Sequence, residues 1–199
     1  MIGIVDYGVG NLFSLKSSLK FLEADCIVTN DADVIYKCDK VILPGVGAFE
    51  DARKKLGEQG LDSCVCELAK KGTDILGICL GMQLLFDKSY EYGEHMGLGL
   101  VPGEVKLIET DNNLKIPHIG WNALSIKQGE NVFKYILNGA HVYFVHSYYA
   151  TNCAKDTIAT TEYGIELTAA VRKDNVVGMQ FHPEKSGRIG LDILRAFIE

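Results

Sequence analysis

The 199-residue sequence has little of several features that would take it away from an ordinary folded domain. Four prolines are too few for a proline-rich linker. No run approaches the roughly 18 apolar residues of a membrane-spanning helix. The N-terminus has neither the basic start nor the long apolar stretch of a secretion signal. We therefore expect a single globular domain over residues 1–199, with no membrane segment.

Positive charge is also in short supply. Lysine and arginine number 20 against 26 aspartates and glutamates, so the formal net charge is −6. A protein that binds nucleic acid must neutralise phosphates, and one that adheres to an anionic membrane needs a basic surface. The charge balance therefore disfavours both classes of partner.

The six cysteines include no C-x-x-C pair, which argues against a zinc or redox motif. Because 47% of the residues are hydrophobic, the chain has enough core to fold without disulfides or a metal. We interpret most of the thiols as small buried apolar groups and expect a reducing, cytoplasmic location. Cys79 is the exception.

Strand-like and helix-like segments alternate through the first half of the chain. Apolar runs predict strands at 2–6, 26–29, 40–43 and 73–78, the third stopped by Pro44-Gly45. Helical spacing follows at 12–22, 48–71 and 80–87, broken near Gly57 and Gly60. In the second half, strands are predicted at 105–108, 142–145, 157–161, 167–172 and 176–181, before an amphipathic helix at 189–198. The expected fold class is α/β, with a mostly parallel central sheet flanked by helices and an antiparallel strand set added in the second half.

The run Gly77-Ile78-Cys79-Leu80-Gly81 joins an apolar strand to a helix. This is the context of a nucleophile on a sharp turn, where flanking glycines let the helix and the strands approach. A helix N-terminus favours a thiolate and offers backbone N–H groups to an oxyanion. The alternative is a buried structural cysteine beside turn glycines, and this run alone leaves both open.

Among five histidines, His182 has the best setting for a general base. It follows the strand at 176–181 and begins the run His182-Pro183-Glu184. Residues two apart in extended backbone share a side, so the Glu184 carboxylate can orient the imidazole and stabilise its charged form. A loop histidine beside a solvated glutamate is the common alternative. The set of Cys79, His182 and Glu184 together favours catalysis.

Two further runs have more than one interpretation. Pro44-Gly45-Val46-Gly47 ends a buried strand at the sheet edge where α/β sites gather, and its glycines let N–H groups turn toward a ligand. A plain turn is the alternative. Pro117 to Asn122 holds the only tryptophan, Trp121, in what we expect to be a glycine-bearing loop. An exposed Trp indicates a partner surface and a buried one a core residue.

Six runs in this order resemble the class I, triad-type glutamine amidotransferases, and within that class the glutaminase subunits of imidazole glycerol phosphate synthases. The resemblance covers essentially the whole chain. The runs that carry it are DYGVGN (6–11), PGVG (44–47), GICLGMQLL (77–85), PHIGWN (117–122), YFVHSY (143–148) and QFHPEKS (180–186).

The resemblance implies a role for each matching residue. Cys79 would be the nucleophile, His182 the base and Glu184 its orienting partner. The oxyanion hole would use the N–H of Leu80 and, after a peptide flip in the PGVG run, that of Val46. Residues expected to bind glutamine are Gly47, Gln83, Glu91, Ser147 and Tyr148. Residues expected to face a partner are Asn11, Trp121, Tyr143 and Lys185.

The implied reaction hydrolyses L-glutamine through a thioester and releases ammonia. The ammonia would pass to a (β/α)8-barrel cyclase in a heterodimer, forming imidazole glycerol phosphate and an aminoimidazole carboxamide ribotide in histidine biosynthesis. No metal or organic cofactor is implied. Three alternatives remain: a glutaminase that feeds a sugar-amidating synthase of surface-polysaccharide pathways, a cysteine peptidase or small-molecule hydrolase on the same fold, and a non-catalytic binding subunit.

Overall fold

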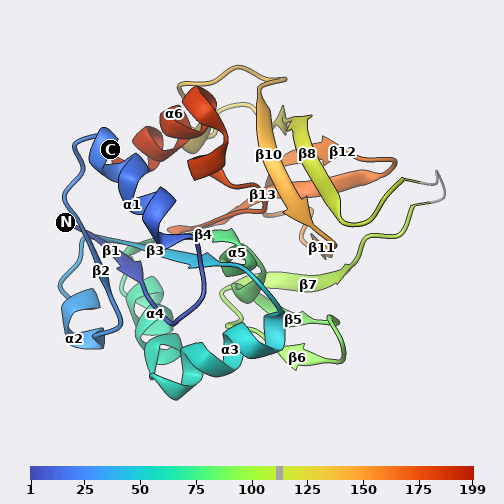
Figure 1. Cartoon of the computed structure of the whole chain (residues 1–199). Coiled ribbons are helices and arrows are strands. Elements are labelled where there is room, and N and C mark those ends of the chain that lie inside the picture. Colours follow the sequence, from blue (N-terminus) through green and yellow to red (C-terminus); the bar gives the residue numbers. More distant parts are fainter. Residues whose placement is uncertain (111–113) are drawn as a thin grey trace.

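The computed structural model describes residues 1–110 and 114–199 and is built around a twisted sheet of order β2-β1-β3-β4-β14-β13-β12-β9 (Figure 1). Five neighbouring strands run parallel: β2 (Cys26–Thr29), β1 (Ile2–Val5), β3 (Lys40–Gly45), β4 (Asp74–Cys79) and β14 (Val176–Met179). Three antiparallel strands extend the sheet: β13 (Glu166–Lys173), β12 (Thr157–Glu162) and β9 (Ser125–Ile126). This arrangement confirms the expected α/β class.

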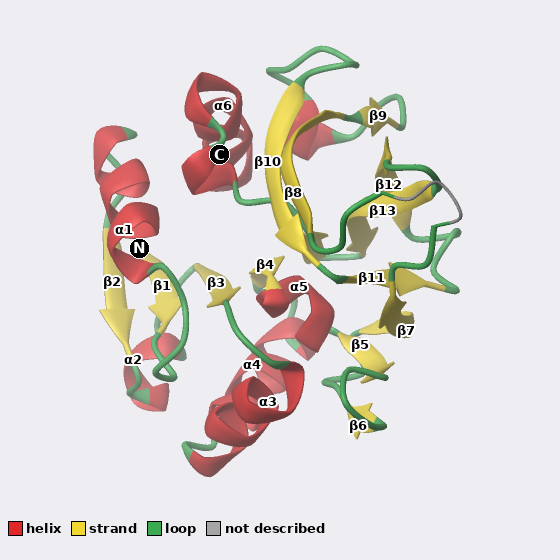
Figure 2. Cartoon of the chain, turned by 45° about the vertical axis from the view of Figure 1, so that its right-hand side comes forward, coloured by secondary structure: helices red, strands yellow, loops and turns green. Residues whose placement is uncertain are grey.

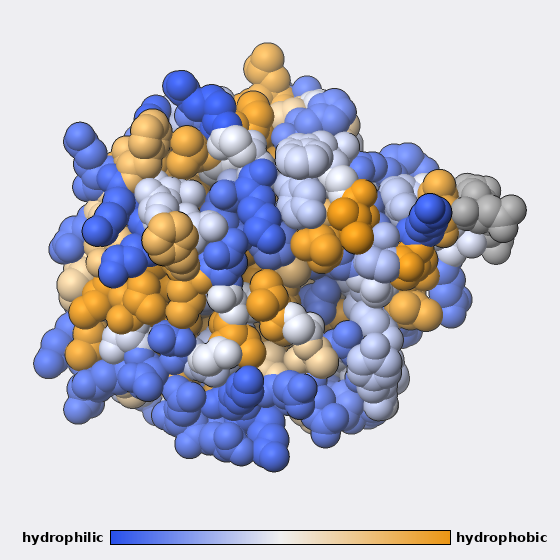
Figure 3. All heavy atoms as spheres, viewed as in Figure 1, coloured by the Kyte–Doolittle hydropathy of each residue, from blue (hydrophilic) through white to orange (hydrophobic). Residues whose placement is uncertain are grey.

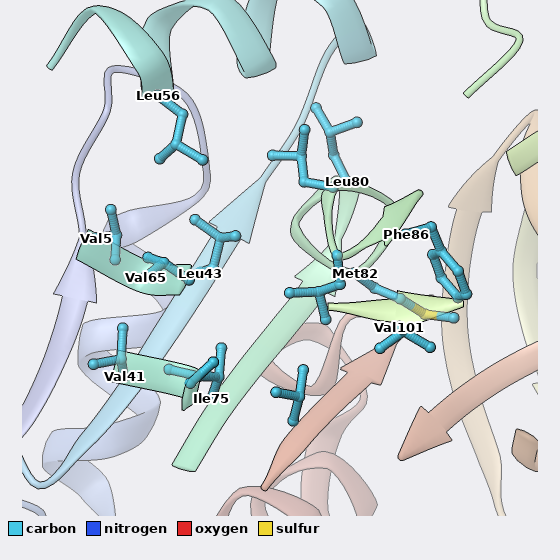
Figure 4. Packing of buried hydrophobic residues seen from close by; sticks show 14 of the residues in the cluster. Val5, Val41, Leu43, Leu56, Val65, Ile75, Leu80, Met82, Phe86 and Val101 are labelled. Atoms are coloured by element: carbon cyan, nitrogen blue, oxygen red, sulfur yellow. The ribbon is translucent and has the colours of Figure 1, made fainter. Parts of the chain in front are cut away.

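Helices cover both faces of the parallel half (Figure 2). Those of one face are α1 (Leu12–Phe21) and α6 (Gly187–Ile198), and those of the other are α2 (Ala32–Ile35), α3 (Phe49–Glu58), α4 (Leu61–Lys70) and α5 (Leu80–Leu84). Alternate residues of β3 supply the two cores: Ile42 packs with the α1 and α6 cluster, whereas Val41 and Leu43 pack with the α3 and α4 cluster. Figure 4 shows Val41 and Leu43 in that second core. The two cores hold β3 and β4 rigidly at the centre of the sheet.

Two small sheets stand beside the carboxyl ends of the parallel strands. One pairs β10 (His141–His146) with β8 (His118–Ala123), and the other has the order β11 (Tyr148–Thr151), β7 (Val101–Leu107), β5 (Phe86–Ser89), β6 (His95–Met96). Short 3₁₀ turns lie at η1 (Asn131–Phe133) and η2 (Pro183–Lys185). The two small sheets lie beside the edge of the main sheet at which β4 ends with Cys79.

Three local expectations were wrong. The helix predicted at 80–87 ends at Leu84, and Phe86 begins a strand. The strand at 40–43 continues through Pro44 and Gly45, because the pairing with β1 ends at Ile42 and the missing N–H of proline disrupts no bond on that side. The run around Trp121 is strand β8 rather than a loop, since it pairs along its whole length with β10.

Gly81 lets α5 touch the neighbouring strand directly. A Cβ atom built at this position would lie 1.8 Å from the carbonyl oxygen of Leu43. Gly77 is similarly confined, because its Cβ would lie 2.7 Å from the Gly81 carbonyl oxygen. No side chain fits at either position, so the expectation that the flanking glycines permit close approach is confirmed.

We predict that Gly81→Ala destabilises the fold by about 3 kcal/mol or more, because the clash is with backbone and β3 lies between two packed cores. Gly129→Ala is the matched control. Gly129 has a positive φ of 89° but open space around its Cβ position, so its cost is limited to about 1–2 kcal/mol of backbone strain. Denaturant unfolding followed by circular dichroism measures both, and equal losses would contradict this explanation.

Candidate active site

Cys79 is the last residue of β4 and immediately precedes α5. Its backbone has φ 54° and ψ −112°, a conformation that residues with side chains rarely adopt. The tight strand-to-helix turn made possible by Gly77 and Gly81 imposes it. Although the residue is only 7% exposed, the side chain lines a cavity. The G-x-C-x-G run therefore has the strand–turn–helix context that a nucleophile requires.

His182 and Glu184 form a buried pair after β14. His182 Nδ1 and Glu184 Oε1 are 2.8 Å apart, and the two side chains are 2% and 3% exposed. Because a carboxylate only accepts, Nδ1 carries the proton. The His182 N–H donates to the carbonyl of Tyr143, and the Ser186 hydroxyl donates to the His182 carbonyl, which fixes the backbone on both sides. This geometry is what the i, i+2 spacing predicts.

The surroundings of His182 favour its charged form. Burial on its own lowers the pKa of the imidazole, but the interactions with the nearby Cys79 and with the hydrogen-bonded Glu184 outweigh burial and raise the pKa to about 9. Within the described residues, Nε2 has no hydrogen-bond partner of good geometry. Nε2 is therefore the nitrogen left to exchange a proton with Cys79.

His146 lines the same cavity but is poorly suited to act as the base. Both of its ring nitrogens are engaged, Nε2 with His118 Nδ1 at 3.0 Å and Nδ1 with the Tyr148 carbonyl at 2.9 Å. Burial, with smaller contributions from the charges of His118 and His182, lowers the pKa of His146 to about 4. Of the two imidazoles at the cavity, His182 alone has a free nitrogen and a raised pKa.

The cavity at Cys79 measures about 360 Å³, within the usual range for a small-molecule site. The five residues expected to bind glutamine all line it, namely Gly47, Gln83, Glu91, Ser147 and Tyr148, together with Val46 and Leu80 of the expected oxyanion hole. Sequence patterns did not reveal Pro117, Val145 and His146 as lining residues. His146 could have been found from the alternation of the strand at its end, because alternate residues of β10 are buried and His146 continues that pattern. No sequence pattern indicates Pro117.

Gln83 and Glu91 are partly engaged by the protein itself. Gln83 Nε2 donates to the Tyr148 carbonyl at 3.1 Å, which leaves its Oε1 as the atom able to accept from a ligand. Glu91 Oε2 accepts from the Phe49 N–H at 2.6 Å at the start of α3. Burial raises the pKa of the Glu91 carboxyl, and that hydrogen bond partly opposes the shift. Their contacts with a substrate stay predictions.

Three of the four residues expected to face a partner lie together beside the cavity. The Trp121 and Tyr143 rings are 4.8 Å apart, and Lys185 Nζ stands 5.7 Å above the Tyr143 ring. Trp121 is 61% exposed and its strand neighbour Ile119 58%, and in Figure 3 the surface over β8 and β10 is mixed, with apolar residues in orange beside pale and blue ones. Trp121 is therefore exposed and is not a core residue, and its role as a partner surface stays a prediction.

Asn11, the fourth, begins α1 and accepts from the Ser14 N–H at 3.4 Å. With Val46, His182 and Glu184 it lines a small second hollow behind the histidine.

In the described ranges 1–110 and 114–199, no cluster of metal-ligating side chains is found and no helix is long and apolar enough to cross a membrane.

Comparisons with known proteins show the family to which the chain belongs. The family model for class-I glutamine amidotransferases matches residues 3–199. Imidazole glycerol phosphate synthase subunit HisH of Lactiplantibacillus plantarum is 48% identical over 100% of this chain and 95% of its own, and that of Caldanaerobacter subterraneus subsp. tengcongensis is 51% identical over 100% and 98%.

Solved structures add a fold-level likeness. A crystal structure of a glutamine amidotransferase superposes with a TM-score of 0.77 at 21% identity, covering 98% of this chain and 96% of that one. A chain of PurLQS from Thermotoga maritima gives 0.73 at 19% identity, covering 98% and 96%. The family model matches nearly the whole chain, and the HisH relatives are 48% and 51% identical to it. This chain therefore belongs to the class-I glutamine amidotransferase family.

Proposed function

We propose that this chain is the glutaminase subunit of an imidazole glycerol phosphate synthase, with residues 1–199 acting as one unit. The observation that carries the chemistry is that Cys79 and His182 line one cavity of about 360 Å³, while Glu184 holds the His182 ring through a buried contact of 2.8 Å. The assignment to this synthase is supported by the HisH relatives, which are 48% and 51% identical over the whole chain.

In the proposed mechanism, His182 Nε2 takes the proton of the Cys79 thiol, and the sulfur attacks the side-chain amide carbon of glutamine. The new C–S bond produces a tetrahedral oxyanion. When this collapses, the C–N bond breaks and His182 gives its proton to the departing nitrogen, which leaves as ammonia. Water, deprotonated by the same imidazole, then attacks the thioester, releasing glutamate and the thiol. Glu184 holds the ring and stabilises its cation throughout.

The oxyanion would be bound by the N–H of Leu80, with the N–H of Val46 joining after a flip of the Gly45–Val46 peptide. Gly45 pairs with Cys79 across β3 and β4, which brings Val46 to the cavity. A Cβ at Gly45 would lie 2.7 Å from the Tyr7 hydroxyl oxygen, so only glycine fits. Lacking a side chain, it also makes the flip inexpensive. Loss of one such donor typically lowers the rate about 10²–10³-fold, so an unflipped chain would be a weak glutaminase until its partner is bound.

The proposed partner is a (β/α)8-barrel cyclase that covers Asn11, Trp121, Tyr143 and Lys185 and receives the ammonia. Lys185 lines the cavity and stands over the Tyr143 ring, so a surface at this position closes over the mouth of the cavity. The proposed location is the cytoplasm, consistent with six cysteines that are all free.

We predict that Cys79→Ala lowers glutamine-dependent synthesis by the complex with the cyclase about 10³-fold or more, but leaves synthesis from added ammonium salt intact. Cys79 makes ammonia and does not use it. Cys66→Ala, at a half-buried thiol of α4, is the control and keeps both activities. The proposal would be overturned by a Cys79→Ala complex that still hydrolyses glutamine.

Glu184→Gln should lower the pKa of His182 from about 9 by about one unit or more, because the carboxylate hydrogen bond and charge that favour the imidazolium are lost. Its glutaminase rate should fall less than that of His182→Ala, which removes the proton carrier itself. An NMR titration of the His182 ring follows the first effect. Glu94→Gln, at an exposed carboxylate, should leave the titration unchanged. An unmoved His182 titration in Glu184→Gln would refute the assigned role.

A further inference from the structure

Two buried amides lie near the nucleophile. Gln180, which follows β14, is 0% exposed, and Gln83 of α5 is 5% exposed. Gln180 Nε2 is 3.8 Å from Cys79 Sγ, and Gln180 Oε1 is 3.0 Å from Gln83 Nε2. The sequence pattern gives Gln180 no chemical role, because it lies within the predicted apolar strand 176–181. A fully buried amide placed against the sulfur nevertheless needs an explanation, since burying a polar group is costly unless it is hydrogen-bonded.

A backbone carbonyl fixes the direction in which both amides point. The Tyr148 carbonyl can only accept, so the group of Gln83 that faces it at 3.1 Å must be the NH₂. The same NH₂ reaches Gln180, whose facing atom must therefore be the carbonyl oxygen. Turning the Gln180 amide over would set two NH₂ groups against each other. Gln83 thus donates to both the Tyr148 carbonyl and Gln180 Oε1. This leaves the NH₂ of Gln180 facing the sulfur as a donor.

The Val145 carbonyl, a further polar neighbour of the sulfur, has the opposite preference. Cys79 Sγ is 4.0 Å from the Val145 carbonyl oxygen, which can accept a proton from a thiol but repels a thiolate. An N–H from Gln180 can only donate, so it stabilises the negative sulfur. The five-residue α5 provides only a small helix dipole for the same purpose.

We propose that Gln180 stabilises and positions the Cys79 thiolate by donating its amide N–H to the sulfur, oriented by Gln83 and the Tyr148 carbonyl. The inference rests on the proposed function, in which that thiolate is the nucleophile. Gln180 thereby adds a second stabilising group to the one that His182 provides. It acts on the free protein, before glutamine or a partner is bound.

The test is the pH dependence of Cys79 alkylation by iodoacetamide in the full-length protein, followed at that residue by peptide mass spectrometry. Gln180→Met keeps the length of the side chain and removes the donor. We expect the pH midpoint of alkylation to rise by about one unit, which is a tenfold change in the thiol–thiolate equilibrium. Gln128→Met makes the same change at an exposed loop position and should leave the midpoint unmoved.

A purely structural role for Gln180 would lower thermal stability without moving the midpoint, and that result would overturn the inference. If Gln180→Met does not fold, Gln180→Leu removes the same donor and is read in the same way. Glutaminase activity of the wild-type complex is measured in parallel. Its absence would refute the proposed function, whereas activity with an unmoved midpoint in the Gln180 variant would refute this inference alone.

Discussion

The backbone contact between Gly81 and Leu43 is the constraint on which the site depends. A helix that starts this close to β3 leaves no room for a side chain at Gly81, and the turn before it forces Cys79 to a positive φ. That strained turn, held between two packed cores, aims the thiol at the cavity beyond the carboxyl edge of the sheet. Packing of the two cores thus stabilises the strained turn, and the turn fixes the position of the Cys79 sulfur.

Electrostatics then determines what that atom can do. Cys79, His182 and Glu184 are all nearly buried, so the interactions among them are stronger than they would be in water. Glu184 keeps the imidazole protonated at Nδ1 and favours its cation, while Gln180 offers the sulfur a donor. His146, which lines the same cavity, is kept neutral mainly by burial, which lowers its pKa to about 4 although its hydrogen bond to the Tyr148 carbonyl partly opposes the shift. Two histidines therefore have different protonation behaviour within one site.

Much of this architecture could be predicted from the sequence, because strand and helix periodicity is clear up to Cys79 and again after residue 141. The two-residue spacing of His182 and Glu184 predicted their contact, and the glycines flanking Cys79 predicted the tight turn that presents it. What could not be predicted depends on distant pairing. The 118–123 segment becomes a strand only because β10 lies beside it. Gln180 meets Cys79 only because β14 pairs with β4, and neither relation leaves a local signal.

The central claim is that glutamine is hydrolysed through a covalent bond to Cys79. Its most direct test is to quench the complex with acid during turnover of glutamine and to map the γ-glutamyl adduct by mass spectrometry. We expect an adduct on the peptide that contains Cys79 and on none of the peptides that contain the other five cysteines. Turnover with the adduct on another residue would contradict it.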